Sequence, residues 1–443
     1  MAKLDIRKKL SERKGKIPPA FPYACLKAFG AIPNCKRMKL EIVDNVGVKK
    51  IPDNFLVLSN HTSRCDWQYI GLAFPGHRLN YMASYIEFNR SHMHFVFDLL
   101  KVIPKRNFIN DIHPILEVMQ IIKQGGNVIL FPEGKSSISG SNQPIMPGTA
   151  QMVRQLKVPV YSTTIRGGYM SNTQWDIYDR PGKVVIEVNR LFTVEETQTL
   201  PLEEIERRIN AAIYNDDFEW NRTARVKYEG NDRIANRLEE HLYLCPKCGR
   251  ELTMHGEGNV FKCTACGNGA TIDEYYDLHP LNEDCLIPKT LRVWYELQRR
   301  KCYRHIKNDP DFRIEEKVTL GALPNDHYVD KTVTSEPVGE GIITLDRNEF
   351  TYKGTKNGEP FELHQKTVNM LSVVLETDSS YFGAFFDNRE YYEFHPEHKL
   401  VPKWLLSVEE CHRLAGGKWQ NNLPEQQWIY EDDKPDDREN YYL

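Results

Sequence analysis

The fold of this chain is set by the stretch Phe55-Leu-Val-Leu-Ser-Asn-His-Thr-Ser-Arg-Cys-Asp66. Its apolar beginning predicts a buried strand, and the polar residues after it predict a loop that leads into a helix. His61 then lies at the end of the strand, and Asp66 lies in the first turn of the helix. A carboxylate there can bind one ring nitrogen, fix the tautomer and stabilise the protonated ring. The pattern predicts a general base that activates a hydroxyl group.

Strands and helices alternate on both sides of this stretch. Short apolar runs predict strands, and amphipathic stretches such as 111–124 predict helices between them. The expected strands cover residues 55–58, 79–82, 127–131, 159–165 and 183–188. This alternation is typical of an α/β domain with a mixed sheet and flanking helices. We place that domain at residues 39–220.

Three further stretches begin or end expected strands. Phe131-Pro-Glu-Gly-Lys-Ser-Ser137 combines a glycine with a lysine and hydroxyl groups, which suits a bound phosphate or carboxylate. Val102–Asn107 brings the adjacent cations Lys105 and Arg106 to another strand end. Val158-Pro-Val160 begins an apolar strand. The order of the four stretches is more informative than any one of them.

Together they resemble the four sequence blocks of the glycerolipid acyltransferases, the family that includes 1-acyl-glycerol-3-phosphate acyltransferase. Asn60, His61 and Asp66 match the block Asn-His-x4-Asp. The stretch 131–137 matches Phe-Pro-Glu-Gly-Thr-Arg-Ser, with Lys-Ser in place of Thr-Arg. The stretch 102–107 lacks the family's glycine and is one residue shorter, and the fourth block is matched only by its first Val-Pro.

The resemblance implies a mechanism and a substrate class. His61, oriented by Asp66, would deprotonate the free hydroxyl of a lysophospholipid, which then attacks the thioester of acyl-CoA or acyl-carrier protein. Direct transfer of this kind does not need Cys65 as a nucleophile. The acceptor most in keeping with the family is 1-acyl-glycerol-3-phosphate, which would give phosphatidic acid. Its phosphate would be held by Lys105 or Arg106 together with the loop residues Glu133, Gly134 and Lys135.

Other readings stay open at this point. The acceptor can instead be glycerol 3-phosphate or another lysolipid. From a different class, the chain can be a non-catalytic adaptor that binds lipid and carries a zinc ribbon. The intact His61 and Asp66 argue against the adaptor, because a retired site is free to lose its base.

Four of the ten cysteines form two Cys-x2-Cys pairs, each followed by glycine. Each pair can bind one ion through two thiolates, and the glycine permits the tight turn that follows. The pairs predict a structural Zn²⁺ in a zinc ribbon at residues 245–285, because four thiolates leave no position for water. The expected ligands are Cys245, Cys248, Cys263 and Cys266. Acidic residues around the pairs argue against nucleic acid as a partner.

The remaining sequence predicts a second folded part and its connections. From 317 to 420, short apolar runs separated by turns such as Lys356-Asn-Gly358 predict an antiparallel β domain closed by a C-terminal helix. Strands capped by one helix resemble a pleckstrin-homology-like domain. We expect a helical connector at 221–244, a helical linker at 286–316 and an acidic tail at 421–443 that is disordered around 431–439.

Charge is distributed unevenly along the chain. The net charge is -3, but residues 1–40 carry +9. A basic N-terminal arm at 1–38 suits contact with an anionic membrane, with Ile17–Phe29 either in the lipid interface or packed on the domain's own core. The chain has no apolar run long enough for a membrane-spanning helix and no secretory signal pattern. We therefore expect a cytoplasmic protein that is peripheral on the cytoplasmic face of the membrane.

Overall fold

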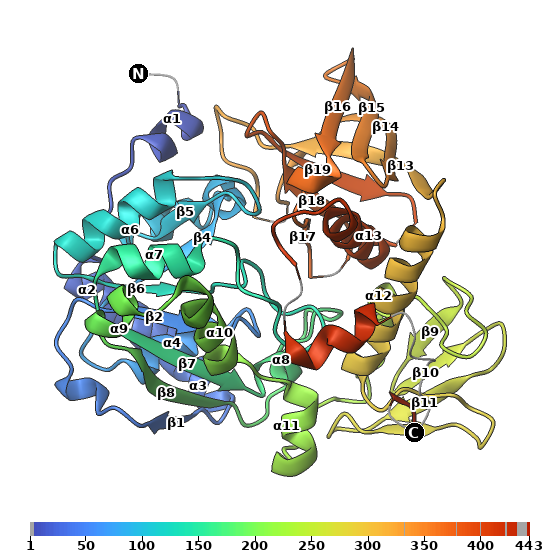
Figure 1. The fold of residues 1–443 in the computed structure, drawn as a ribbon, viewed down its shortest axis with the longest axis horizontal. Helices are drawn as coiled ribbons and strands as arrows, with labels where there is room; N and C mark the ends of the chain where they lie inside the picture. The colour runs from blue at the N-terminus through green and yellow to red at the C-terminus, as the bar shows by residue number, and fades with distance from the viewer. Residues whose placement is uncertain (1–3, 332, 378, 399, 421–422, 432–440) are drawn as a thin grey trace.

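The computed structural model describes residues 4–331, 333–377, 379–398, 400–420, 423–431 and 441–443. Figure 1 shows an α/β domain on the left, a cysteine-rich module at the lower right and an antiparallel β domain at the upper right. The expected disordered stretch of the acidic tail lies, except for Glu431, outside the described residues.

The α/β domain is built on a six-stranded mixed sheet. Its strand order is β1-β8-β7-β2-β6-β3. Neighbours pair in parallel except β7 and β8, which are antiparallel. The bounds are β1 Glu41–Asp44, β2 Leu56–Ser59, β3 Leu79–Asn80, β6 Asn127–Leu130, β7 Val160–Arg166 and β8 Val185–Phe192. Strands β4 (Met82–Ser84) and β5 (Ile103–Lys105) form a separate parallel pair. The sheet is mixed, as the sequence predicts.

Helices cover both faces of this sheet (Figure 1). Alternate residues of a strand point to opposite faces, so Leu56 and Leu58 pack in one core and Val57 packs in the other. The first core includes helices α6 (His113–Lys123), α7 (Thr149–Leu156) and α10 (Leu202–Ile213), and the second includes α4 (Asp66–Ala73). Because both faces are buried, β2 and β6 are mostly apolar, whereas β7 also buries the hydroxyl-bearing residues 162–164.

The described part of the basic arm is folded against the body. It forms α1 (Ile6–Ser11), α2 (Ala20–Cys25), a π-helical turn (Leu26–Ala31) and α3 (Ile32–Arg37). Ile6 and Leu10 are buried in a cluster that also includes Phe385 of the β domain. Tyr23 is buried, whereas Phe21 and Phe29 are 78% and 83% exposed. The segment 17–29 therefore packs on its own domain and also presents aromatic rings to the outside.

The expected helical connector at 221–244 is largely irregular. Helix α11 (Asp217–Ala224) reaches only the first four residues of the connector. In the rest of the connector, the helical structure is one 3-10 turn, Leu238–Glu240. Asn231, Asp232 and Arg237 have left-handed backbone angles that interrupt a helix. The connector instead buries Ile234 and Leu238 in the core that reaches the cysteine-rich module. Long-range packing thus decides its path.

The cysteine-rich module is a four-stranded antiparallel sheet with the order β12-β11-β10-β9. Its strands are β9 Met254–Glu257, β10 Val260–Cys263, β11 Gly269–Ile272 and β12 Leu278–Pro280. Helix α12 (Leu291–Asn308) follows and forms most of the expected helical linker. Phe261 on β10 packs against Trp294 on α12, with ring centres 5.2 Å apart. The module is therefore fixed to the linker helix.

The C-terminal part is a seven-stranded antiparallel sheet with the order β16-β15-β14-β13-β19-β18-β17. Helix α13 (Val401–Leu414) packs on it through Trp404, which stacks against Phe382. The strands are β13 Arg313–Ala322, β14 Glu336–Asp346, β15 Glu349–Lys356, β16 Glu359–Lys366, β17 Val374–Leu375, β18 Phe382–Phe385 and β19 Tyr391–Pro396. The antiparallel β domain is confirmed, and its pleckstrin-homology-like character stays a prediction.

One hydrophobic cluster joins all three parts. It runs from Trp175 of the α/β domain through Phe261 and Trp294 to Phe394 of the β domain. Part of the expected acidic tail also joins the body, because the 3-10 helix Pro424–Tyr430 buries Ile429 and contacts α12. Leu423 and Ile429, which lie on either side of Glu425 in the sequence, are both buried, and burial of their apolar side chains favours this packing. The domains predicted from sequence are therefore not loosely tethered modules.

Candidate functional site

The loop after β2 is held by Asn60. Its amide group donates to the carbonyl of Ile165 and accepts from the Ile165 N–H, both at 2.8 Å. This paired contact fixes the end of β2 against the end of β7. His61, the next residue, is consequently held at the carboxyl edge of the sheet, where ligands of open α/β sheets commonly bind.

Asp66 binds and orients the ring of His61. The Asp66 carboxylate is 1% exposed and lies 2.8 Å from His61 Nδ1. It also accepts from the backbone N–H and side-chain hydroxyl groups of Thr62 and Ser63. An ionised carboxylate can only accept, so Nδ1 carries the hydrogen and Nε2 keeps its lone pair. His61 Nε2 is thereby prepared to take a proton.

The other side of the ring is placed by the loop at 131–137. The His61 ring stacks on Phe131, with centres 4.2 Å apart, and its side chain stays 26% exposed. Ser136 Oγ lies 3.4 Å from His61 Nε2. The predicted base is therefore accessible, and a hydroxyl group of the protein stands beside its reactive nitrogen.

Glu133 joins the two loops through hydrogen bonds within the protein. Its buried carboxylate accepts from the His61 N–H at 2.9 Å, from Asn142 Nδ2 at 3.0 Å and from the Gln143 N–H at 2.8 Å. Burial raises its pKa to about 8, although these three donors act in the opposite direction. The predicted phosphate ligand thus serves in this structure as an anchor between loops.

The two cations at the end of β5 are in different situations. Arg106 forms an ion pair with Asp111 at 3.4 Å, and its guanidinium lies over the Tyr85 ring. Lys105 has no hydrogen-bond or ion-pair partner for its ammonium group within the described ranges of the chain. Burial lowers the pKa of Lys105, and the charge of Asp111 opposes that shift. Lys105 is therefore the cation left available for a ligand.

Gly134 and Lys135 are engaged within the protein. The Gly134 N–H donates to Phe131, and its carbonyl accepts from Asn107 Nδ2 at 3.1 Å. Gly134 has a φ of +81°, and an added Cβ would lie 2.9 Å from Met146, which explains the glycine. Lys135 binds Glu409 of α13. The structure therefore places these two predicted phosphate ligands in contacts of another kind.

Cys65, which lies between His61 and Asp66 in the sequence, is not prepared for nucleophilic attack. It is buried and accepts from Asn34 Nδ2 at 3.2 Å. Burial raises the pKa of its thiol to about 11. A thiolate at this position is therefore disfavoured, in agreement with direct transfer.

The four predicted cysteine ligands come together in the cysteine-rich module. Their Sγ atoms all lie within 4.8 Å of one another. Sγ of Cys245 is 3.7 Å from that of Cys266, and Sγ of Cys248 is 3.8 Å from that of Cys263. Tetrahedral zinc with Zn–S bonds of about 2.3 Å requires sulfurs about 3.8 Å apart. The four cysteines therefore form a cluster that could hold a metal ion, and two of its sulfur separations match those of tetrahedral zinc.

Three contributors to the site escape prediction from the sequence. Asn107 and Asn142 brace the loop at 131–137, and a polar side chain in a loop is too common to be singled out. Glu409 reaches Lys135 across 274 residues of sequence. No local pattern can indicate a contact of that separation.

Comparison with known proteins supports an acyltransferase domain. Residues 42–166 match the model of a family described as Acyltransferase. No curated protein matches the chain. Among solved structures, it is similar to a 1-acyl-sn-glycerophosphate (LPA) acyltransferase, PlsC, from Thermotoga maritima, with 21% identity and a TM-score of 0.37 over 43% of this chain and 76% of that one. It is also similar to the RAN binding domain of the nuclear pore component NUP2 from Ashbya gossypii, with 12% identity and a TM-score of 0.18 over 23% of this chain and 98% of that one.

Proposed function

We propose that this protein transfers a fatty acyl group from acyl-CoA or acyl-carrier protein to the free hydroxyl of a phosphate-bearing lysolipid. The acceptor that we favour is 1-acyl-glycerol-3-phosphate, which would give phosphatidic acid. The observation that carries the proposal is the His61–Asp66 pair, because Asp66 occupies Nδ1 and leaves Nε2 accessible as a base. The match of residues 42–166 to the acyltransferase family supports the same reaction class.

The proposed step moves one proton and one acyl group. His61 Nε2 takes the hydroxyl proton while the hydroxyl oxygen attacks the thioester carbonyl carbon. When the tetrahedral intermediate collapses, the C–S bond breaks and the thiolate leaves. The protonated ring, stabilised by Asp66, then returns its proton to the leaving sulfur. No covalent acyl-enzyme is required, and the buried Cys65 is not used.

Lys105 is the residue that we assign to the acceptor phosphate. It is a cation at a strand end that pairs with none of the described residues, whereas Arg106 is paired with Asp111. A charge-assisted hydrogen bond contributes about 1.5–3 kcal/mol. Replacing Lys105 with methionine should therefore raise KM for a phosphate-bearing acceptor by roughly tenfold to a hundredfold.

Transfer of a labelled acyl group to a panel of acceptors tests this function. The panel contains 1-acyl-glycerol-3-phosphate, glycerol 3-phosphate, a choline lysolipid and monoacylglycerol, each with acyl-CoA and with acyl-carrier protein. We expect turnover to be fastest on 1-acyl-glycerol-3-phosphate and the effect of Lys105→Met to disappear on monoacylglycerol, which has no phosphate. Absence of turnover on every pair, with the protein folded, would refute the enzymatic function.

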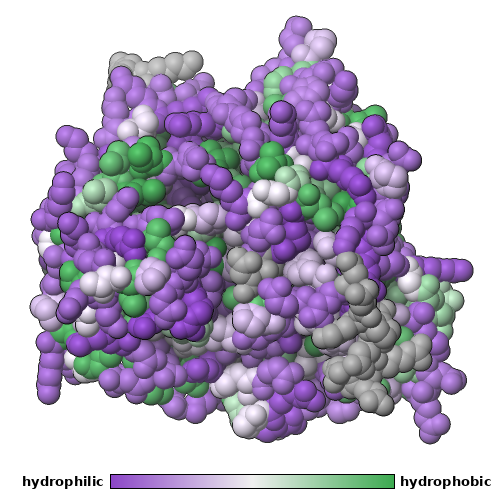
Figure 2. Space-filling view, in the orientation of Figure 1, coloured by the Kyte–Doolittle hydropathy of each residue, from purple (hydrophilic) through white to green (hydrophobic). Residues whose placement is uncertain are grey.

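We further propose that the protein works at the surface of an anionic membrane on the cytoplasmic side. Within the part of the chain that is described, no helix has both the length and the apolar character needed to cross a bilayer. Phe21, Phe29 and Ile32 are exposed on the N-terminal helices, and Ile112 and Leu116 are exposed at α6. Figure 2 shows hydrophobic side chains gathered over the upper left of the molecule, where α6 lies. Such side chains next to lysines suit the lipid interface.

Vesicle flotation tests this placement. Burying one phenylalanine contributes about 1.5–3 kcal/mol, so Phe21→Ser with Phe29→Ser should lower the vesicle-bound fraction severalfold or more. Phe361→Ser, a partly exposed position on β16 of the β domain, is the matched control and should leave binding unchanged. Equal flotation of wild type and the double variant would exclude the N-terminal helices as the contact.

We assign Zn²⁺ to the four-cysteine cluster. The fit rests on sulfur separations near those of a tetrahedral thiolate site. Cys245, Cys248, Cys263 and Cys266 would hold the ion, which leaves no open coordination position. The ion would stabilise the module and would take no part in acyl transfer.

A further inference from the structure

Lys135, in the loop beside His61, is enclosed by the C-terminal part of the chain. Its side chain is only 10% exposed. Its ammonium group binds the Glu409 carboxylate and donates to Ser372 Oγ at 3.0 Å. The Trp419 ring lies 5.4 Å and the Phe108 ring 5.8 Å from the same nitrogen, in cation–π range. Three of these four residues around the ammonium belong to the C-terminal part of the chain.

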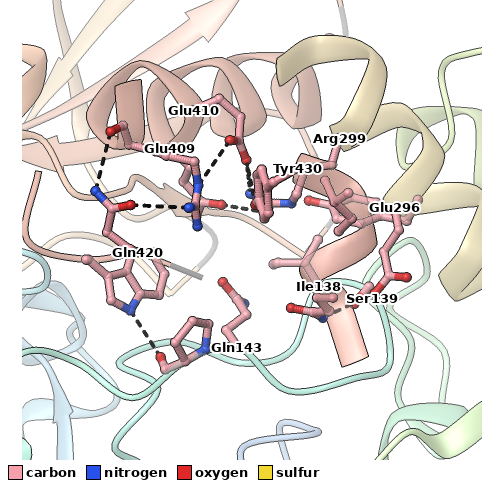
Figure 3. Close-up of a pocket in the computed structure, with 15 residues that line it drawn as sticks. Ile138, Ser139, Gln143, Glu296, Arg299, Glu409, Glu410, Gln420 and Tyr430 are labelled. Carbon is pink, nitrogen blue, oxygen red and sulfur yellow. Dashed lines mark hydrogen bonds and ion pairs between the residues drawn. The ribbon is translucent and has the colours of Figure 1, made fainter. Parts of the chain in front are cut away.

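Glu409 is a buried carboxylate shared between two cations. It accepts from Arg299 of α12 at 2.6 Å, and Arg299 also binds Glu410 at 2.8 Å. Figure 3 shows Glu409 and Glu410 on α13 with Arg299 beside them. Burial alone would raise the pKa of Glu409, but the charges of Lys135 and Arg299 hold it at about 2. Glu409 is therefore ionised and committed to these partners at neutral pH.

Two further contacts fasten the same loop region. Trp419 Nε1 donates to the Pro144 carbonyl at 3.1 Å, and Gln426 Nε2 donates to the Asn142 carbonyl at 3.2 Å. Asn142 in turn donates to Glu133, which accepts from the His61 backbone. The C-terminal part thus contacts the segment 135–144 at three residues, which are Lys135, Asn142 and Pro144.

A displacement of Lys135 would also displace Ser136, whose hydroxyl lies beside His61 Nε2. Ser136 follows Lys135 in the chain, and its hydroxyl lies 3.4 Å from His61 Nε2. On the other side, Gly134 is tied to Asn107. Catalytic geometry is sensitive to displacements near 1 Å, so the loop must be held from outside the α/β domain as well as from within it.

We propose that Glu409 is a positioning residue for the active site, which acts through Lys135 to hold the loop beside His61. The β domain is in this view the second half of the active-site support and not an independent lipid-binding module. The expected change in kcat rests on the proposed acyl transfer, whereas the role of Glu409 in holding the loop does not. It explains why Lys135 stands at the threonine position of the block Phe-Pro-Glu-Gly-Thr-Arg-Ser: the side chain serves an interdomain contact.

Glu409→Gln compared with Glu410→Gln tests the inference. Both variants remove one buried charge from α13 that binds Arg299, but only Glu409 also binds Lys135. We expect Glu409→Gln to lower kcat by roughly tenfold to a hundredfold with KM for the acyl donor unchanged. We expect Glu410→Gln to keep kcat within about twofold, even though the two lose comparable stability. Equal kcat in the two variants, high or low, would overturn the inference.

A double variant shows whether the pair acts as a unit. Lys135→Met combined with Glu409→Gln leaves no uncompensated charge, so its kcat should be no lower than that of Glu409→Gln alone. If the fold-losses in kcat of the two single variants multiplied in the double variant, the result would contradict the proposal. Should Glu409→Gln fail to fold, Ser372→Ala removes a hydroxyl that binds both groups without leaving a charge unpaired. It should lower kcat in the same direction by a smaller factor, and wild-type kcat in Ser372→Ala would count against the proposal.

Hydrogen exchange provides a readout that does not need activity. Peptides covering 131–146 should exchange faster in Glu409→Gln than in Glu410→Gln, because only the first releases the loop. Identical exchange in the two variants would overturn the positioning role. If the wild type shows no acyl transfer at all, the proposed function fails, while the exchange comparison still decides whether Glu409 holds this loop.

Discussion

Replacing His61 with alanine should lower kcat by roughly 10²- to 10⁴-fold, the range that general acid–base catalysis contributes. The variant removes the group placed between Asp66 and the acceptor hydroxyl. The fold should persist, since the His61 side chain is partly exposed and Asp66 keeps the N–H and hydroxyl donors of Thr62 and Ser63. The measurement is the rate of labelled acyl transfer at saturating acceptor, with circular dichroism as a check on folding.

His77→Ala is the matched control for this prediction. His77 also pairs with a carboxylate, since its Nδ1 lies 2.6 Å from Asp53, but its Nε2 lies 2.9 Å from the Val48 carbonyl. With both nitrogens occupied, His77 cannot take a proton from a substrate. We expect its replacement to cost stability and leave kcat per folded molecule within a few-fold. Retained turnover in His61→Ala would remove the basis for the proposed mechanism.

Removal of the zinc ion that we propose for the four-cysteine cluster should unfold the cysteine-rich module and lower activity with it. We expect about one zinc per chain in protein purified without chelator. Structural zinc in small domains contributes about 10–16 kcal/mol of binding free energy that is also folding free energy. Cys245→Ser should therefore abolish stoichiometric zinc and lower the Tm strongly. Metal analysis and thermal unfolding measure both effects.

Activity should fall because the module is packed against the helix that supports the active-site loop. Phe261 contacts Trp294 on α12, and α12 carries Arg299, which binds Glu409. Cys285→Ser is the control, since Cys285 lies at the end of the module and is outside the four-cysteine cluster. Its zinc content and Tm should match the wild type. A Cys245→Ser protein with unchanged Tm would show that the cluster does not stabilise the fold.

The parts of the structure that the sequence predicts well have local causes. The strands at 55–58, 127–131 and 159–165 are found within one or two residues, because strands buried on both faces are rich in apolar and β-branched residues. The two Cys-x2-Cys pairs predict the four-cysteine cluster equally well, since each pair depends on a local turn.

The failures lie where packing between distant segments decides. The connector at 221–244 has helix-compatible composition, yet Ile234 and Leu238 are better buried against the cysteine-rich module. The tail at 421–443 looks acidic as a whole, but Ile429 is buried and Gln426 reaches the active-site region. Long-range burial overrides local preference in both segments.

The sequence by itself determined that His61 pairs with Asp66 and that the four cysteines cluster, because each of these contacts depends on short spacings along the chain. Only the tertiary structure decided which of the predicted cations is available to a ligand. Lys105, Arg106 and Lys135 look alike in sequence, yet Asp111 pairs with Arg106 and Glu409 pairs with Lys135. A cation is free or committed according to the charges that folding brings beside it, and those charges come from anywhere in the chain.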